Sequence, residues 1–148
     1  MEKKISLKSA CKSKLEAQIA EWTSRMKGLQ QDLEGDNKGS MGDKYETARA
    51  MLQMEMDKAG IQLSRLKEQF AFLGSLPDGR VAGVVPGAIV VTDQGNYFIS
   101  LPLGKIAKGG KEYICISLQS PLGQEMKSGS ATKKFSFQGK TFSIQEIL

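Results

Sequence analysis

Hydrophobic residues in the first half of the chain repeat with the spacing of a coiled coil. One stripe alternates steps of four and three and consists of Leu15, Ile19, Trp22, Met26, Leu29 and Leu33. A second stripe recurs at steps of seven and consists of Tyr45, Leu52, Ala59, Leu66 and Leu73, with Met56, Leu63 and Phe70 between them. Both patterns place apolar side chains on one face of an α-helix. If the spacing of the first stripe is continued toward the N-terminus, it falls on Lys8 and Lys12. We therefore expect the stripe to shift by one residue there, so that Leu7 and Cys11 continue it.

Residues 35–42, Gly-Asp-Asn-Lys-Gly-Ser-Met-Gly, separate the two stripes. Three glycines with Asp, Asn and Ser disfavour a helix and favour a turn. A short turn between two helices with matching stripes favours an antiparallel hairpin, because each helix then buries its stripe against the other. We therefore predict a coiled-coil hairpin over residues 1–76, with an acidic tip near residues 32–46.

After Leu76 the period of the hydrophobic pattern falls to two, as in β-strands. The alternation predicts five strands, over residues 84–92, 96–101, 111–118, 133–138 and 140–147. Ser120 followed by Pro121 is typical of a helix start and predicts one short helix over residues 121–127. The fold class that we predict is α+β: the N-terminal hairpin, then a mostly antiparallel β domain with one short helix over residues 77–148.

Composition narrows the functional classes. Twenty-one Lys and Arg against 16 Asp and Glu give a net charge of +5 (21 minus 16) on 148 residues. The absence of His excludes His-ligated metal sites and His-based catalytic groups. Cys11 and Cys115, 104 positions apart (115 minus 11), form no metal-binding or disulfide framework and are interpreted as small buried hydrophobic residues. No apolar segment fits a signal peptide or a membrane span, so we expect a cytoplasmic protein with no membrane partner.

Acidic residues flank the predicted turn. Asp32, Glu34 and Asp36 lie on its first side, and Asp43 and Glu46 follow it. Asp43 and Glu46 are three residues apart, so on a helix they share a face and can approach one cation together. Two carboxylates seldom hold Mg²⁺ alone, but they can complete a site that another molecule begins. The same spacing is typical of a helix N-cap, where acidic residues complement the helix dipole, so capping is the alternative interpretation.

Two segments of the chain resemble motifs of one known family. At the turn, Gly42-Asp43-Lys44-Tyr45-Glu46-Thr47-Ala48 is similar to the run Gly-Asp-Leu-Lys-Glu-Asn-Ala of the bacterial Gre transcript-cleavage factors. Farther along, Ser120-Pro121-Leu122-Gly123-Gln124-Glu125-Met126 resembles the family's Ser-Pro-Ile-Gly-x-Ala-Leu segment, and a closing strand pair follows it. The two segments occur in the family's order and on the expected elements. The chain therefore resembles a Gre factor over most of its length.

The resemblance implies a function in transcription elongation. Gre factors bind RNA polymerase through a β domain of FKBP-like fold and insert the hairpin into the secondary channel. By this resemblance Asp43 and Glu46 are catalytic and metal-binding residues, which share Mg²⁺ with the polymerase and do not bind the ion stably alone. The shared ion activates water to cleave the 3′ end of backtracked RNA, so the protein is no enzyme by itself and has no small-molecule substrate. The residues implied to dock on polymerase are Ser120, Pro121, Leu122 and Gly123.

Several alternatives stay open at the tip. Lys38, Lys44 and Arg49 are candidate RNA contacts, or they belong to a solvated helix face. Lys44, Tyr45 and Thr47 depart from the family's tip, and a relative with an altered tip occupies the channel and inhibits. Cleavage and obstruction are therefore both compatible with the sequence. A third interpretation is a plain interaction protein whose hairpin binds an unrelated helical partner.

Overall fold

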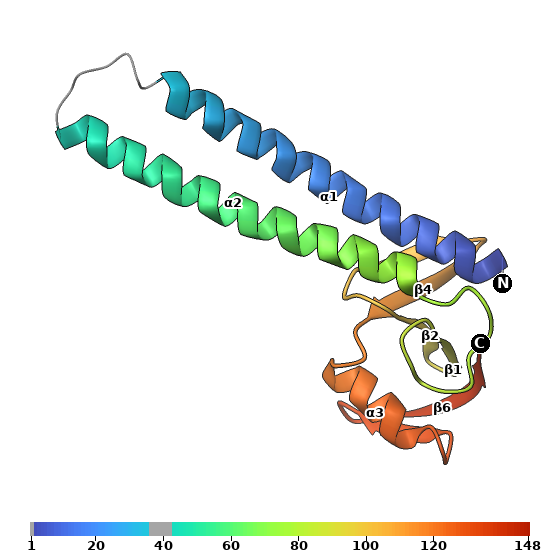
Figure 1. The fold of residues 1–148 in the computed structure, drawn as a ribbon. Helices are drawn as coiled ribbons and strands as arrows, with labels where there is room; N and C mark the ends of the chain where they lie inside the picture. Colours follow the sequence, from blue (N-terminus) through green and yellow to red (C-terminus); the bar gives the residue numbers. More distant parts are fainter. Residues whose placement is uncertain (1, 36–42) are drawn as a thin grey trace. The chain divides into compact units, whose positions relative to one another are not determined.

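Two long helices begin the chain. The computed structural model describes residues 2–35 and 43–148, so the predicted turn over residues 35–42 lies, apart from Gly35, outside the described residues. Helix α1 spans Glu2–Gly35 and helix α2 spans Asp43–Ser75 (Figure 1). The two stripes of the sequence thus fall on two helices of nearly equal length.

By its internal contacts the chain forms two compact units. The first, called the hairpin unit here, is Lys14–Ala71. The second, called the sheet unit, joins Met1–Ser13 to Phe72–Leu148. The start of α1 and the end of α2 therefore belong with the sheet, whereas the sequence-based boundary between residues 76 and 77 follows the end of α2.

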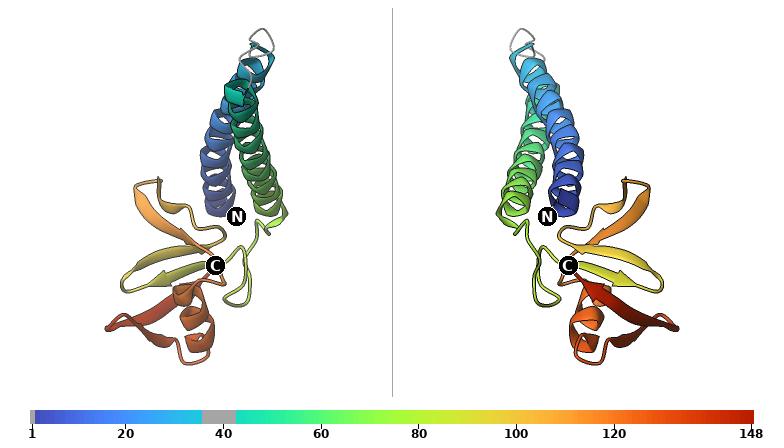
Figure 2. Two further views of the ribbon diagram at one scale, coloured as in Figure 1. Left: turned by 90° about the vertical axis from the view of Figure 1, so that its left-hand side faces the viewer. Right: turned by 90° about the vertical axis from the view of Figure 1, so that its right-hand side faces the viewer.

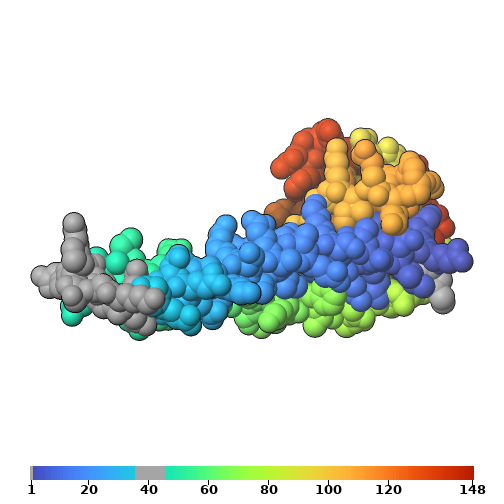
Figure 3. Space-filling model, turned by 90° about the horizontal axis from the view of Figure 1, so that it is seen from above, coloured from blue at the N-terminus to red at the C-terminus, as the bar shows by residue number. Residues whose placement is uncertain are grey.

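The predicted apolar stripes hold the hairpin unit together. Leu15 and Ala59 are fully buried, and Leu66 is 2% exposed. Met26 Cε lies 3.6 Å from the position that a Cβ atom would take on Gly60, so the helices approach closely where α2 has no side chain. Side chains of α1 (blue) and α2 (green) lie against each other in the space-filling view (Figure 3). This burial confirms the hairpin that the two stripes predict.

Toward the turn the stripes are less completely covered. The half-buried stripe residues of this region are Trp22, Met26, Leu29, Leu33, Leu52 and Met56. The guanidinium of Arg25 lies 4.3 Å from the centre of the Trp22 ring, in a cation–π contact. Arg25 therefore covers part of the indole.

Within the sheet unit, the predicted burial of Leu7 and Cys11 on α1 is confirmed, but Lys8 of the unshifted frame is buried as well. Leu7 and Cys11 are fully buried, and so is Leu73 near the end of α2. Leu76, just after α2, is 5% exposed. Cys11 Sγ lies 3.7 Å from Cys115 Sγ, so residues far apart in the sequence meet in one core. The burial of both cysteines confirms their interpretation as small buried residues.

Two buried lysines on α1 fix the segment that leaves α2. Lys4 Nζ donates to the Gly79 carbonyl oxygen at 2.6 Å. Lys8 Nζ donates to the Leu76 carbonyl oxygen at 2.6 Å and to the Asp78 carboxylate at 2.9 Å. Burial lowers the pKa of Lys4, and the negative charge of Asp78 partly opposes this shift. The bonds satisfy ammonium groups that would otherwise be costly to bury.

Six strands form one sheet in the described part of the chain. They are β1 (Ile89–Thr92), β2 (Gly95–Ile99), β3 (Gly104–Lys108), β4 (Lys111–Ile116), β5 (Lys134–Phe137) and β6 (Lys140–Ile147). Their order is β3-β4-β2-β1-β6-β5, and all the neighbours are antiparallel except β2 and β4. Helix α3 (Pro121–Gly129) packs beside β5 (Figure 2). The mostly antiparallel β domain with one short helix is therefore confirmed.

The sheet differs from the sequence prediction at two places. Strand β3 was not predicted, because only Ile106 among its five residues is buried and the period-two signal is weak. The strand predicted over residues 84–92 begins only at Ile89. Pro86 cannot donate to a ladder, and Gly87 has a φ of 97°, which extended strands do not adopt.

One face of the sheet supports an apolar core together with α3. Its members are Val84, Ala88, Val90, Tyr97, Ile99, Met126, Phe135, Phe142 and Ile144. The rings of Phe135 and Phe142 stack at 4.7 Å between centroids across the β5–β6 pair. Tyr97 meets Phe142 edge to face at 6.3 Å. This core fixes the position of α3, through Met126, on the sheet.

We expect Leu66→Ala to destabilise the hairpin unit by about 2–5 kcal/mol, because it deletes a buried side chain and leaves a cavity. Ile61→Ala, at a residue that is 62% exposed on the same helix, is the matched control and should change stability by less than about 0.5 kcal/mol. Urea unfolding followed by circular dichroism measures both. Equal losses for the two variants would show that the stripe does not hold the helices together.

Candidate functional site

The acidic pair of the tip lies at the beginning of α2. Asp43 is the first residue of the helix, and Glu46 follows three residues later with an exposed side chain. Arg49, a candidate RNA contact, is exposed one turn farther on. The side chains of Asp43 and Lys44, and all of Lys38, lie outside the described residues. The structure therefore places both carboxylate residues in the first helical turn, where the helix dipole favours negative charge.

A hollow of about 630 Å³ lies beside the tip, between the end of α1 and the beginning of α2. It is lined by Gln31, Asp32, Gly35, Ala48, Met51, Leu52 and Glu55. Met51 is 63% exposed and contributes an apolar wall. Asp32 and Glu55 add one carboxylate from each helix, and the Glu55 carboxylate lies 3.6 Å from Lys58 Nζ. The sequence analysis places Asp32 among the acidic residues of the tip but does not identify Glu55. Its position three residues after Leu52 of the stripe is the feature that could have placed Glu55 next to the stripe.

The metal-binding role of Asp43 and Glu46 stays a prediction. Among the residues whose side chains are described, no three His, Cys, Asp or Glu come together to hold a metal ion. Mg²⁺ prefers an octahedral shell of oxygen ligands, and two carboxylates fill only part of it. Carboxylates are oxygen donors of the type that Mg²⁺ takes, and a pair such as Asp43 and Glu46 would leave most of the shell to other ligands.

The Ser120–Gly123 segment forms the start of α3, as the sequence predicts. Ser120 is the N-cap: its Oγ accepts from the Gly123 backbone N–H at 3.0 Å and donates to the Ser117 carbonyl oxygen at 2.6 Å. Pro121 occupies the first turn and is exposed, whereas Leu122 is half-buried. The capping bonds hold the segment in one conformation, with Pro121 and part of Leu122 presented to solvent.

Gly123 serves the packing of α3. A Cβ atom added to this buried glycine would lie 2.5 Å from the Ser117 carbonyl oxygen and 2.7 Å from the Leu118 carbonyl oxygen. Such distances are too short for ordinary contacts, so only glycine allows the helix to approach the preceding backbone. The four residues that the resemblance implies for docking therefore divide into two roles. Ser120 and Gly123 maintain the fold, and Pro121 and Leu122 supply surface.

Comparison with known proteins gives little further assignment. No protein-family model and no curated protein matches the sequence. Among solved structures, the transcription factor Gfh1 is similar over 93% of this chain and 93% of its own, with 14% sequence identity and a TM-score of 0.39. A similarity at this score and identity assigns neither a family nor a function to this chain. The two-part architecture described above follows from the chain's own helices and strands. No helix among the described residues is long and apolar enough to cross a membrane.

We expect Gly123→Ala to destabilise the sheet unit by about 1–3 kcal/mol, because the added methyl group collides with two backbone carbonyls. Gly28→Ala in α1 is the matched control, since nothing lies within 4 Å of a Cβ at that position. There the better helix propensity of Ala should stabilise the protein by about 0.5–1 kcal/mol. Thermal unfolding of both variants measures the two effects. A stabilised Gly123→Ala variant would contradict the proposed close approach.

Proposed function

We propose that the protein is a transcription elongation factor of Gre type, which binds RNA polymerase through its secondary channel and stimulates cleavage of backtracked RNA. The observation that carries this proposal is the position of the tip motif. Asp43 and Glu46 belong to a motif that resembles the Gre tip, and they lie in the first turn of α2, where the hairpin connects its two helices. The second resembling motif forms the start of α3.

The hairpin has the dimensions and stiffness that such a role requires. The 33 residues of α2 extend over roughly 50 Å at a rise of about 1.5 Å per residue. An isolated helix of this kind would fray and bend, but the buried stripe couples it to α1 along its length. A stiff pair of helices can carry its terminal side chains down a narrow channel without a large loss of conformational entropy.

At the end of the channel, this chain would supply oxygen ligands for a metal ion. A Mg²⁺ ion held jointly by Asp43, Glu46 and the polymerase would supply two-metal chemistry, that is, activation of the attacking water and stabilisation of the leaving oxygen. Asp43 and Glu46 would contribute carboxylates from one helical face. The contacts that we predict between the RNA 3′ segment and Lys38, Lys44 and Arg49 stay predictions. The chain itself would have no catalytic activity without polymerase.

The exposed part of the α3 start is the proposed docking surface. Pro121 is held rigidly by its ring and by the Ser120 cap, so it loses little entropy when a partner covers it. Leu122 is half-buried and offers a limited apolar contact. A small rigid apolar patch of this kind is suited to a defined position on a protein surface.

A second function of the same class is supported by the tip sequence. Lys44, Tyr45 and Thr47 stand where the family pattern has Leu, Lys and Asn. A bulky tyrosine between the two acidic residues can change how the carboxylates approach an ion. The alternative is therefore a regulator that occupies the channel and releases no RNA fragment. A plain interaction protein that binds an unrelated helical partner is the remaining candidate, and it would not bind polymerase.

We expect the double variant Asp43→Ala/Glu46→Ala to retain its affinity for RNA polymerase and to lose the stimulated cleavage of backtracked RNA. The reason is that it removes the shared metal ligands and leaves the docking surface unchanged. The measurement is the release of short RNA fragments from stalled elongation complexes in Mg²⁺, together with the affinity for polymerase.

Glu16→Ala/Glu68→Ala is the matched control, because it removes the same charge from exposed positions elsewhere on the two helices. It should cleave as the parent protein does. Unchanged cleavage by the tip variant would remove the shared-metal mechanism. Binding without cleavage by the parent protein would instead support the channel-occupying regulator, and the absence of binding would support the plain interaction protein.

We expect Pro121→Glu to weaken binding to polymerase by about tenfold or more, because it places a charge in the proposed apolar contact. Glutamate is well tolerated in the first turn of a helix, so the fold should be preserved. The affinity is measured by titrating the variant onto surface-bound polymerase. Thermal unfolding checks that the variant is folded. Unchanged affinity with an intact fold would place the docking surface elsewhere.

A further inference from the structure

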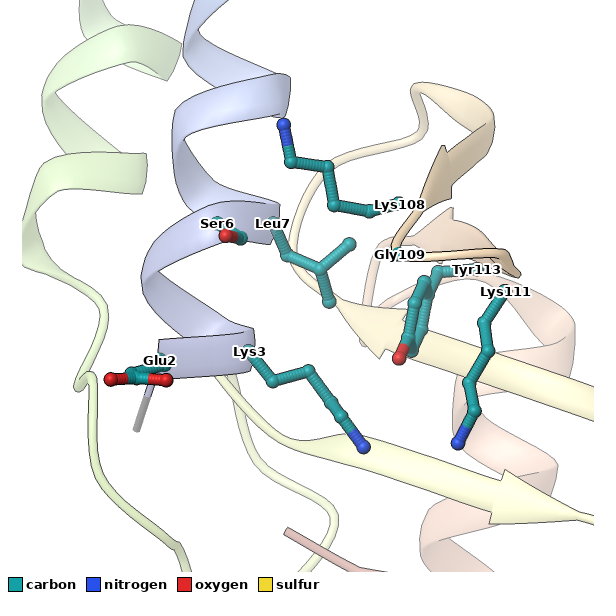
Figure 4. Close-up of a pocket in the computed structure, with 8 residues that line it drawn as sticks. All are labelled: Glu2, Lys3, Ser6, Leu7, Lys108, Gly109, Lys111 and Tyr113. Carbon is teal, nitrogen blue, oxygen red and sulfur yellow. The ribbon is translucent and has the colours of Figure 1, made fainter.

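A cavity of about 390 Å³ lies within the sheet unit. The first two turns of α1 form one wall, and the turn between β3 and β4 forms the other (Figure 4). Leu7 and Tyr113 supply its apolar surface, and both are buried. Its volume lies in the range of about 300–1,000 Å³ that is typical of small-molecule sites.

Three lysines give the cavity a positive charge. Lys3 comes from α1, and Lys108 and Lys111 flank the glycine turn between the strands. In Figure 4 the ammonium groups of Lys3 and Lys111 lie on the side to which the Tyr113 hydroxyl points, whereas Lys108 extends the other way along α1. Among the described residues, none of the ion pairs uses any of these three lysines.

Tyr113 provides a second and independent sign of a ligand. The residue is 2% exposed, and its hydroxyl group points into the space between Lys3 and Lys111 (Figure 4). Within the described part of the chain this hydroxyl forms no hydrogen bond, and its oxygen stays accessible, since no buried side-chain nitrogen or oxygen there lacks a partner. An accessible hydroxyl that projects from a buried ring into the cavity is a donor that an oxygen atom of a ligand can use.

The backbone around the cavity also favours an anion. The first amides of a long helix have no partner inside the helix, and the positive end of its dipole lies there. Gly109 and Gly110, with φ of 60° and 79°, allow a tight turn whose backbone comes close to the cavity without side chains. Glu2 is the one carboxylate of the lining, and in Figure 4 it points away from the ammonium groups of Lys3 and Lys111.

We propose that this cavity binds a phosphorylated small molecule. The phosphate oxygens would lie between the ammonium groups of Lys3 and Lys111 and accept a hydrogen bond from the Tyr113 hydroxyl. The remainder of the molecule would lie along Leu7 and the Tyr113 ring. Inorganic phosphate alone would leave most of the volume unfilled, so a diphosphate with an attached organic group fits the cavity better. The proposal does not depend on the function in transcription.

The test is a titration of the full chain with inorganic pyrophosphate and with ADP, followed by backbone amide NMR and by calorimetry. We expect both to shift the amide signals of Lys3, Gly109, Gly110 and Lys111. ADP should bind more tightly than pyrophosphate, because it also contacts the apolar wall. The variant Lys3→Gln/Lys111→Gln should lose about tenfold or more in affinity for each probe. Tyr113→Phe, which removes only the hydroxyl oxygen, should also weaken binding while the protein stays folded.

The matched control is Lys134→Gln/Lys140→Gln, which removes the same charge from two exposed lysines on β5 and β6. It should bind both probes as the parent chain does. Equal losses in the two double variants would mean that the anions respond only to net charge and would overturn the proposal. So would the absence of binding, or amide shifts confined to other regions. Tighter binding of a single-stranded RNA at these same residues would also overturn it and assign the surface to nucleic acid.

Discussion

The burial of one apolar stripe on each long helix is the interaction on which the rest of the hairpin depends. A helix with a single hydrophobic face has no stable surface of its own in water, and burial of that face supplies most of its stability. Leu15 from α1, and Ala59 and Leu66 from α2, are removed almost completely from solvent. The pairing makes a stiff element from two helices that would separately be marginal. Any role for the residues at the turn requires this stiffness.

The sheet unit is closed by a polar interaction rather than by apolar burial alone. Lys4 and Lys8 carry their ammonium groups into the interior and meet the carbonyl oxygens of Gly79 and Leu76. Since burial lowers the pKa of Lys4, its charge is retained at a cost, and the hydrogen bonds offset that cost. The arrangement fixes where the chain leaves α2 and enters the sheet. Apolar side chains at these two positions would leave the carbonyl groups without donors.

The helices were predictable because their signal is local and repeated. Stripes at steps of three, four and seven predicted the hairpin and the burial of Leu7 and Cys11, but they did not predict the burial of Lys8. Strand β3 was not predictable by the same means, because it has one buried side chain and lies at the edge of the sheet, where pairing with β4 rather than alternation defines it. A local hydrophobic pattern indicates which side chains are buried, but it does not indicate which element they pack against or which strand pairs with which.

The candidate sites show the same limit. The sequence identified Ser120–Gly123 as one segment, but only the packing separates the fold role of Gly123 from the exposed surface of Pro121. The cavity beside Tyr113 had no sequence signal, since its lysines are ordinary surface residues until the fold brings Lys3 beside Lys111. Distances of this kind depend on long-range topology, which neither periodicity nor a short motif contains.

We propose that the hairpin brings its acidic turn to the active centre of RNA polymerase. The most direct measurement is to bind the protein to stalled polymerase, replace the Mg²⁺ of the active centre by Fe²⁺, and map the cuts that the resulting hydroxyl radicals make in this chain. The account predicts cuts confined to the neighbourhood of Asp43 and Glu46. Cuts in the sheet unit alone, or an uncut chain in a complex that contains it, would contradict the account.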